Sequence, residues 1–476
     1  MKKIKITTTV KKMLADVYTP VGIYLRLRDR FRDTVLLESG DSHATENSYS
    51  FICINAIGGM EVQSKSTIEY KLPNGIVEKT GLNDDDNLSE ILWNYMQRFE
   101  VESEDEKAAK FAQGLYGYFT FDVVPLIEKI DFKSSAENEN LHPSAIPLAR
   151  YRLYQYVIAI NHHRDELLLL ENKISGLESD IESVLSLIKG KDVPIYPFQI
   201  STEETSNLTD EQYIDIVKKG ISSCHRGDVF QIVLSRRFQQ SFTGDEFNVY
   251  RALRHINPSP YLFYFDYGDY KLMGSSPEAQ LVIKGGKAVM HPIAGTFKRT
   301  GDDAEDAQTA EALLVDEKEN AEHVMLVDLA RNDLSTLCTN VTVAKFRQVQ
   351  YYSHVIHMVS EVMGSVAPGV NPFQILFKTF PAGTLSGAPK YKAMQLINEL
   401  EPTARSFYGG AIGFVGFDGS CNHAIMIRSF LSRANTLFYQ AGAGVVAASD
   451  PRSELHEVAN KLNALKAAVE LAKDIG

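Results

Sequence analysis

Short, mainly apolar runs of β-forming residues alternate with turn residues and a few helical stretches over the first 200 residues of the chain. Examples lie at 34–38, 151–160 and 166–171, and this pattern predicts β-strands there. At 209–212 the pattern changes, because TDEQ forms a capping box and the apolar residues after it recur with helical spacing. We therefore expect a helix there, followed by a strand over 228–238.

Later strands are expected at 279–283 and 411–417, and they mix with helices without strict alternation. This order favours an α+β fold, with mainly antiparallel sheets packed together and flanked by helices, over a doubly wound parallel sheet. Pro194, Pro197 and a polar cluster interrupt the regular pattern between residues 189 and 208. We predict two domains, 1–200 and 201–476.

Composition and charge exclude several classes of protein. Lys and Arg number 49 against 61 Asp and Glu, a net charge of −12, and no basic run stands out, so we expect no nucleic-acid partner. No segment approaches the roughly 20 apolar residues of a membrane span. Lys11 and Lys12 interrupt the apolar core that a signal peptide needs. We therefore expect a cytoplasmic protein without membrane contact.

The segment 316–333 is predicted to form an acidic amphipathic helix. The acidic residues in its first turns interact favourably with the helix dipole. Glu319 and Glu322, three residues apart, lie on one face. The expected buried side consists of Val324, Leu326, Val327, Leu329 and Ala330. Such pairs of glutamates are common on solvated helices, so this pair alone does not identify a site.

A second helix repeats the arrangement near the C-terminus. Asp450 is a natural N-cap with Pro451 at the first helical position, and Glu454, Glu457 and Lys461 follow on one face. If the two helices face each other, their carboxylates suit a hard cation such as Mg²⁺.

Three glycine-rich turns are candidates for binding anions through backbone N–H groups. They contain Gly295 with Thr296, the segment 383–390, and the segment 442–444. The sequence GAGVVA that begins at Gly442 matches a dinucleotide-binding pattern, but the 32 residues after Gly444 cannot hold a βαβ unit. We therefore reject a nucleotide site and expect a substrate with more than one carboxylate.

Three further residues are candidates for polar chemistry in apolar surroundings. His357 alternates with apolar neighbours as on a strand, where a lone histidine is more often a core residue than a base. Arg428 lies among apolar residues and needs a carboxylate partner, and Tyr408 could donate to the same anion.

With these motifs the chain resembles the large, synthase subunits of anthranilate synthase, within the chorismate-utilising enzyme family. The motifs are HPIAGTFKR (291–299), DEKENAEHVMLVDLARNDL (316–334), FPAGTLSGAPKYKAM (380–394), YGGAIGF (408–414) and YQAGAGVVAASDPRSELHEVANKL (439–462). They cover the second predicted domain almost end to end, whereas the first 200 residues match the family's N-terminal domain more loosely. The resemblance implies the family's fold and a Mg²⁺-dependent conversion of chorismate and ammonia to anthranilate and pyruvate, the first committed step of tryptophan biosynthesis.

The resemblance also assigns roles to residues. It implies that Glu322 and Glu457 hold Mg²⁺, with Glu454 and Glu319 around them, and that the metal bridges to the ring carboxylate of chorismate. His357 becomes the candidate base, which reverses the structural interpretation above. The catalytic set implied in this way is His357, Glu319, Thr384 and Gln231. The implied substrate-binding set is Gly295, Thr296, Tyr408, Arg428, Gly442, Ala443, Gly444 and Lys461.

Two positions bear on the choice of reaction within the family. Relatives that add water carry a Lys where this chain has Gln231, because water needs a general base and ammonia does not. Aminodeoxychorismate synthases usually carry a Lys where this chain has Ala294. Ammonia and anthranilate are therefore favoured. The alternatives are aminodeoxychorismate synthesis, a subunit that serves both pathways, and a catalytically silent tryptophan-binding regulator.

The source of ammonia and the means of control follow from the same resemblance. No GxCxG nucleophile motif exists here, since Cys224 lies in SSCHRG, so we predict a separate glutamine amidotransferase subunit, anthranilate synthase component II, in a heterotetramer. The segments LLES (36–39), NSYSF (47–51) and NPSPYLF (257–263) resemble a tryptophan feedback pocket, although Ser48 and Leu262 replace the family's usual Arg and Met. The inhibitor-binding set implied is Glu38, Ser39, Pro260, Tyr261 and Leu262. A simple turn before a strand is the alternative interpretation of NPSPY.

Overall fold

The computed structural model describes residues 3–40, 48–83, 85–130, 132, 144–351 and 355–475. Two large β-layers, which share the long strands β3 (Tyr49–Ser64) and β8 (Ala149–Asn161), form its centre. Every strand pair between described residues is antiparallel except β1 with β6. The predicted α+β class with mainly antiparallel sheets is confirmed.

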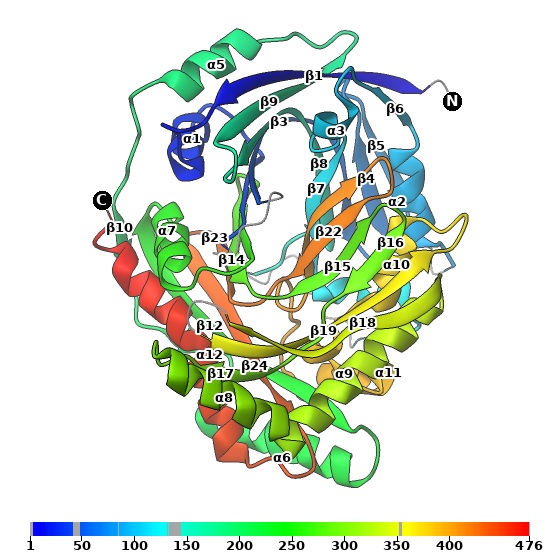
Figure 1. The fold of residues 1–476 in the computed structure, drawn as a ribbon, viewed down its shortest axis with the longest axis vertical. Coiled ribbons are helices and arrows are strands. Elements are labelled where there is room, and N and C mark those ends of the chain that lie inside the picture. Colours follow the sequence, from blue (N-terminus) through cyan, green and yellow to red (C-terminus); the bar gives the residue numbers. More distant parts are fainter. Residues whose placement is uncertain are drawn as a thin grey trace.

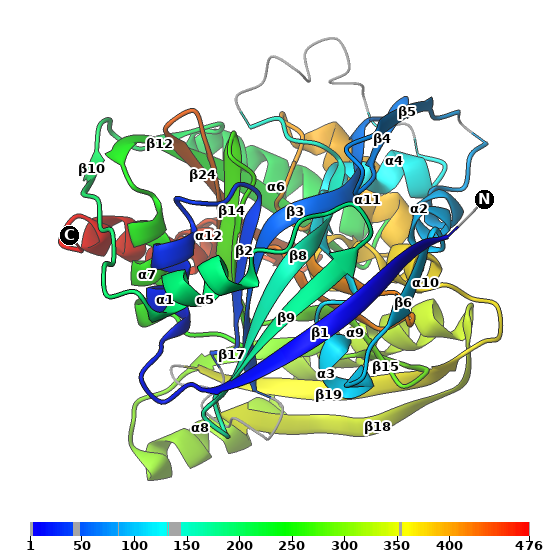
Figure 2. The ribbon, with the colours of Figure 1, turned by 90° about the horizontal axis from the view of Figure 1, so that it is seen from above.

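The first layer runs in the order β6, β1, β9, β8, β3, β2, β13, β14, β23, β24, β12. Figure 2 shows β1, β9 and β8 side by side in this layer. The strands not yet given bounds are β6 (Phe99–Glu102), β1 (Ile4–Leu14), β9 (Glu166–Ile174), β2 (Thr34–Glu38), β13 (Tyr261–Asp266), β14 (Tyr270–Ser276), β23 (Ser429–Arg433), β24 (Thr436–Val445) and β12 (Gln231–Gly244). Three short strands pair with β12: β10 (Phe198–Ile200), β11 (Thr205–Ser206) and β20 (Gly387–Ala388).

The second layer continues from β3 and β8 through β4 and β5 on one side and through β7, β21, β22, β15, β16, β19 and β18 on the other. Their bounds are β4 (Thr67–Lys71), β5 (Val77–Gly81), β7 (Gly114–Phe119), β21 (Ala411–Gly416), β22 (Cys421–Ile425), β15 (Ala279–Lys284), β16 (Lys287–Met290), β19 (Val355–Val366) and β18 (Cys338–Tyr351). Strand β17 (Ile293–Lys298) also pairs with β19.

Three apolar cores define four layers, helix–sheet–sheet–helix. An aromatic-rich core that includes Tyr118, Phe263 and Phe438 lies between the two β-layers. A second core packs the first β-layer against α1 (Pro20–Leu27), α5 (Ile181–Lys189), α6 (Asp210–His225), α7 (Phe247–Ile256), α11 (Lys390–Leu400) and α12 (Pro451–Ala472). A third packs the second β-layer against α2 (Leu88–Met96), α9 (Glu317–Ser335) and α10 (Pro372–Thr379).

The elements that remain are the helix α8 (Asp303–Val315), the short helices α3 (Glu106–Ala109) and α4 (Val124–Ile127), and the 3₁₀ turns η1 (Phe121–Val123) and η3 (Gly383–Leu385). Strands from both sides of residue 200 pair directly, as β2 does with β13 and β7 with β21, so the two parts share cores. The division into domains at 200 stays a prediction. No helix in the described ranges is long and apolar enough to cross a membrane.

Local sequence signals explain where several helices begin. Thr209 and Gln212 form the expected capping box of α6, with side-chain to backbone distances of 3.2 and 2.8 Å. Asp450 accepts from two backbone N–H groups at the start of α12. One expectation for α9 was wrong: the side chain of Val324 is 48% exposed, because the helix buries the face that carries Leu326 and Val327 instead.

Candidate active site

The centre of the site is the glycine-containing end of β24, which pairs with β12 (Figure 1). Gln231, the first residue of β12, folds its side chain over Gly444, and a Cβ placed there would lie 2.6 Å from Gln231 Nε2. A side chain at 444 would therefore displace the Gln231 amide from this place. Ala443 between the glycines is buried in the core against α12.

Helix α9 brings its glutamates to this strand. Gln231 Nε2 donates to Glu322 Oε1 at 2.9 Å, so the predicted metal ligand lies beside Gly444. One turn earlier, the Glu319 carboxylate lies over the backbone of Gly295, 3.2 Å from where a Cβ would stand. Asp316 caps the helix by accepting from the Glu319 N–H at 2.9 Å, which fixes the first turn.

Helix α12 brings its own carboxylates to the same strand from the other side. Glu457 pairs with Lys461 at 2.7 Å, and Lys461 Nζ donates to the carbonyl oxygen of Gly442 at 2.9 Å. Glu454 is buried one turn before Glu457. Glu322 and Glu457 therefore approach one short stretch of β24, from two helices that are distant in sequence. Within the described ranges, no three His, Cys, Asp or Glu side chains gather closely enough to form a metal cluster by themselves.

The predicted base lies on β19 opposite the bulge at Gly295. Gly295 has φ of 69°, and its carbonyl oxygen lies 2.9 Å from His357 Nδ1. Because a carbonyl only accepts, Nδ1 carries the hydrogen and the ring lone pair is on Nε2. Burial and the charge of Arg428 lower the pKa of His357, against the opposing effect of the Gly295 hydrogen bond. Thr296 pairs with His357 in register, and its side chain lies outside the described part of the structure.

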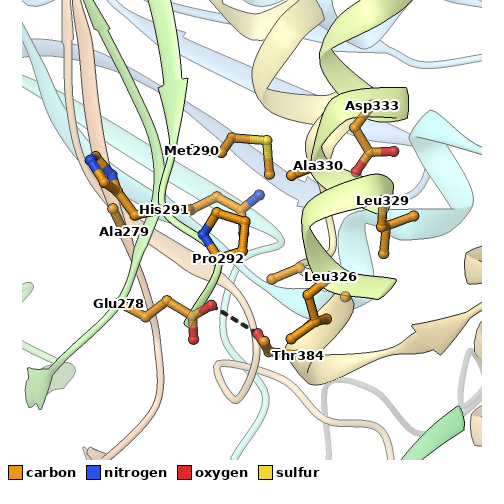
Figure 3. Close-up of a pocket in the computed structure, with 13 residues that line it drawn as sticks. Glu278, Ala279, Met290, His291, Pro292, Leu326, Leu329, Ala330, Asp333 and Thr384 are labelled. Carbon is orange, nitrogen blue, oxygen red and sulfur yellow. Dashed lines mark hydrogen bonds between the residues drawn. The ribbon is translucent and has the colours of Figure 1, made fainter. Parts of the chain in front are cut away.

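Glu278, which the sequence analysis missed, faces the predicted substrate residues. Thr384 Oγ1 donates to Glu278 Oε1 at 3.1 Å (Figure 3). Burial raises the pKa of Glu278 to about 7, against the opposing effects of Thr384, Lys461 and Arg428. Burial in turn lowers the pKa of Arg428, and Glu278 opposes that change. The signal for Glu278 in the sequence is its position as an acidic residue between Pro277 and the apolar strand 279–284.

A buried ion pair supports Tyr408. Arg405 donates twice to Glu401 at 2.6 and 2.8 Å, and it also donates to the carbonyl oxygens of Leu385 and Val233. Its guanidinium carbon lies 5.7 Å from the centroid of the Tyr408 ring. Burial raises the pKa of Tyr408, which keeps the phenol a hydrogen-bond donor. Arg405 thus holds Tyr408, η3 and β12 in one arrangement, and its role depends on tertiary contacts that sequence spacing does not reveal.

The predicted inhibitor residues lie together, away from β24. Leu262 pairs in register with Glu38 across β13 and β2. The buried Glu38 carboxylate accepts from Tyr250 at 2.7 Å and from Arg254 at 2.9 Å through Oε2. Among the described residues, no hydrogen-bond partner reaches its buried Oε1. Ser39, Pro260 and Tyr261 are half-buried beside this pair.

Comparison with known proteins agrees with this geometry. A family model described as chorismate binding enzyme matches residues 45–467. Anthranilate synthase component 1 from Aquifex aeolicus is 37% identical over 97% of this chain and 94% of its own length. The protein of the same name from Geobacillus stearothermophilus is 35% identical over 98% of this chain and 94% of its own length.

Solved structures show the same fold. Anthranilate synthase component I from Streptococcus pneumoniae TIGR4 matches with a TM-score of 0.72 and 28% identity, over 96% of this chain and 99% of that one. The menaquinone-specific isochorismate synthase from Escherichia coli also reaches a TM-score of 0.72, over 98% of this chain and 96% of that one, but at 18% identity, which supports the fold alone. The chain therefore belongs to the chorismate-binding enzyme family.

Proposed function

We propose that this chain converts chorismate and ammonia into anthranilate and pyruvate, as the names of its relatives indicate. One observation supports the proposal: Gln231, which lies over Gly444, donates to Glu322 of α9, and Lys461, which donates to the Gly442 carbonyl oxygen, pairs with Glu457 of α12. Carboxylates suit a metal ion, and cationic side chains beside a strand that contains glycines suit a dianionic substrate.

The donor groups fit Mg²⁺. Glu322 and Glu457 would hold the ion, with Glu319 and Glu454 around them, because Mg²⁺ prefers one or two carboxylates and fills its octahedron with water and substrate oxygens. A compact protein cluster is therefore not required. The buried Oε1 of Gln231, which has no hydrogen-bond partner in the described structure, adds a further oxygen acceptor beside Glu322. Bound Mg²⁺ would neutralise the ring carboxylate of chorismate.

Arg428 and Tyr408 would bind the enolpyruvyl carboxylate of chorismate. Arg428 is a largely buried cation close to Glu278, and a carboxylate from the substrate would balance its charge. Gly295 and the backbone of 442–444 would form the wall against which the ring lies. The hydrogen bonds of Arg405 keep Tyr408 in position for this contact.

Glu278 is suited to act as the general acid of the first step. Ammonia adds to the ring, a C–N bond forms, and the C–O bond to the ring hydroxyl breaks. A pKa of about 7 leaves part of the Glu278 population protonated at neutral pH, so its proton can pass to the departing hydroxyl and release water. Thr384 fixes the carboxyl by donating to Oε1.

His357 is suited to act as the base of the second step. A neutral imidazole whose Nδ1 hydrogen is held by Gly295 presents Nε2 as the proton acceptor. It removes the ring proton as the enolpyruvyl C–O bond breaks and pyruvate leaves, and the ring becomes aromatic. The lowered pKa keeps the imidazole unprotonated and ready for this transfer.

A product assay tests the proposal. The purified chain with chorismate, Mg²⁺ and an ammonium salt should release anthranilate and pyruvate in equal amounts. Ala294 favours this product over aminodeoxychorismate, whereas Gln231 favours ammonia over water as the nucleophile. Accumulation of aminodeoxychorismate without pyruvate would reject our choice in favour of that alternative, and absence of any turnover would support a silent regulator.

We also propose a glutamine amidotransferase partner, since the names of the relatives designate them as component 1. The chain alone should use ammonium salts and not glutamine, and adding the partner should confer glutamine-dependent activity in a heterotetramer. The proposal of a partner subunit would be contradicted if the chain alone used glutamine as well as it uses ammonium salts.

Tryptophan is the proposed inhibitor, bound beside β2 and β13. The buried Oε1 of Glu38 offers an acceptor for the amino group of a free amino acid. Glu38→Gln should raise the tryptophan concentration for half inhibition at least about tenfold, because a charge-assisted hydrogen bond is lost. An unchanged inhibition curve would place the inhibitor elsewhere.

A further inference from the structure

A helix packs behind the strand that carries His357. α8 lies along β17 and β19 (Figure 1). Ile356 and Met358, the neighbours of His357 on β19, are fully buried in a small separate core with Ala310 and Leu313 of α8. Because side chains alternate along a strand, the imidazole lies on the face of β19 opposite to this helix. None of the roles proposed above uses α8 or its core.

Leu313 is the residue of α8 that reaches the bulge beside the imidazole. A Cβ placed on Gly295 would lie 2.5 Å from Leu313 Cδ1 and 3.2 Å from Glu319 Oε2. The Leu313 methyl group therefore packs directly on the glycine backbone, and no side chain fits between them. The carbonyl oxygen of this glycine lies 2.9 Å from His357 Nδ1. One peptide unit thus has the leucine packed against it and the imidazole bonded to it.

Gly295 depends on such support. Its φ is 69°, and the pairing of β17 with β19 shifts register at this residue, so it stands outside the regular ladder. A glycine outside the ladder has wide conformational freedom, and the direction of its carbonyl group is set by the groups packed against it. A shift of this carbonyl would release the hydrogen on His357 Nδ1, and the imidazole could then turn or exchange its tautomer.

Polar contacts hold both ends of α8. Near its start, the buried Asp306 accepts from Arg299 Nε at 2.6 Å, which ties the helix to the end of β17. Near its end, the Leu314 carbonyl oxygen accepts from the Arg347 guanidinium of β18 at 2.5 Å. The helix is therefore fixed to the sheet on either side of the apolar contact that Leu313 makes.

We propose that Leu313 is a positioning residue for His357. It holds the Gly295 peptide in the bulge, and this peptide in turn keeps the imidazole in the orientation in which Nε2 accepts the ring proton. The inference rests on the proposed function, in which His357 acts in the second step only. Loss of the Leu313 contact should therefore slow the elimination of pyruvate and leave the amination of chorismate unaffected.

Variants at this position test the inference. Leu313→Ala removes the methyl groups that contact Gly295, and Leu313→Val is a milder form of the same change. Leu313→Met restores a side chain of similar volume. Leu92→Ala is the matched control, because Leu92 is a similarly buried leucine on α2 that belongs to a different core.

The measurement is a single turnover, with the chain in excess over chorismate and with saturating Mg²⁺ and ammonium salt. Chromatography of quenched samples follows chorismate, the aminated intermediate and anthranilate, and so gives separate rate constants for amination and elimination. Leu313→Ala should lower the elimination constant about 10- to 100-fold, because a displacement of a base by about 1 Å costs up to this much. Leu313→Val should lower it less, and Leu313→Met should recover most of the wild-type rate. Leu92→Ala should leave both constants unchanged.

An unchanged elimination constant in Leu313→Ala and Leu313→Val would overturn the inference. An equal loss in both constants would also overturn it, because the substitution would then have loosened the site as a whole. His357→Ala, measured in the same way, separates this inference from the proposed function. If His357→Ala eliminates pyruvate at the wild-type rate, the assignment of the base fails; if it is slow and the Leu313 variants are not, only the role of Leu313 fails.

Discussion

Replacing Glu278 by Gln should separate stability from activity. Burial raises the pKa of this carboxyl from 4.5 to about 7. Because the native state then binds the proton more tightly than the unfolded chain, stability falls as pH rises from about 4.5 to about 7 and stays low above it. At about 1.4 kcal/mol per pKa unit, the raised pKa lowers the free energy of unfolding by about 3 kcal/mol at pH 8 and by about 1 kcal/mol at pH 5.

Glu278→Gln removes this cost, since the amide does not ionise and its oxygen still accepts from Thr384. The variant should therefore exceed the wild type in unfolding free energy by about 3 kcal/mol at pH 8 and by about 1 kcal/mol at pH 5. Loss of the proton donor should lower kcat by about 10²- to 10⁴-fold. The wild-type rate, measured at constant free ammonia, should also fall on the alkaline side as the acid is lost, and the variant should lack that limb.

Urea denaturation at the two pH values measures the stability difference, and anthranilate fluorescence measures the rate. Glu102→Gln is the control, because Glu102 is exposed and its pKa is lowered by its hydrogen bond with Lys5. It should show no gain at pH 8. A stability difference for Glu278→Gln that is the same at both pH values, or a variant with wild-type kcat, would refute the assignment.

Three further changes probe other parts of the site. Glu322→Gln or Glu457→Gln should raise the Mg²⁺ concentration for half-maximal rate at least about tenfold, because one hard ligand is lost; a Mg²⁺ titration with unchanged midpoint would contradict their role. His357→Ala should slow pyruvate release more than amination, so the aminated intermediate should accumulate in chromatographic analysis, and an unchanged ratio of intermediate to product counts against the base. Arg405→Leu should cost about 3–5 kcal/mol, because Glu401 is left as an unpaired buried charge. Urea denaturation should show that an added Glu401→Leu recovers much of this loss, and equal stability of the single and double variants would argue against the ion pair.

Local signals in the sequence were sufficient for many elements of the fold. The β-forming run at 34–38 corresponds to β2 residue for residue, and Asp450 and Pro451 begin α12 as expected. Such signals act within a few residues, so they do not depend on the rest of the fold. Val324 was placed on the wrong face of α9, because an apolar side chain next to the buried stripe does not reveal which side meets the sheet.

The candidate site was predicted in part, and the missing residues share one property. Helical spacing placed Glu319 and Glu322 on one face, but it did not reveal whether a second helix lay opposite. Glu278 and Arg405 have no periodic or spaced signature, since their chemistry arises from burial and from partners distant in sequence. Residues of this kind become visible only when the strands that surround them are placed.

One glutamate of each helix, α9 and α12, is linked to β24 through a donor side chain. Gly444 leaves the space that Gln231 occupies, and Gln231 then reaches Glu322 on α9. On the other side, the Gly442 carbonyl oxygen holds Lys461, which pairs with Glu457 on α12. Each carboxylate is therefore oriented by a donor anchored at the strand, although the chain carries a net charge of −12. The electrostatic field at the reaction centre is set by these nearby side chains and not by the net charge of the chain, because exposed charges more than about 10 Å away are largely screened.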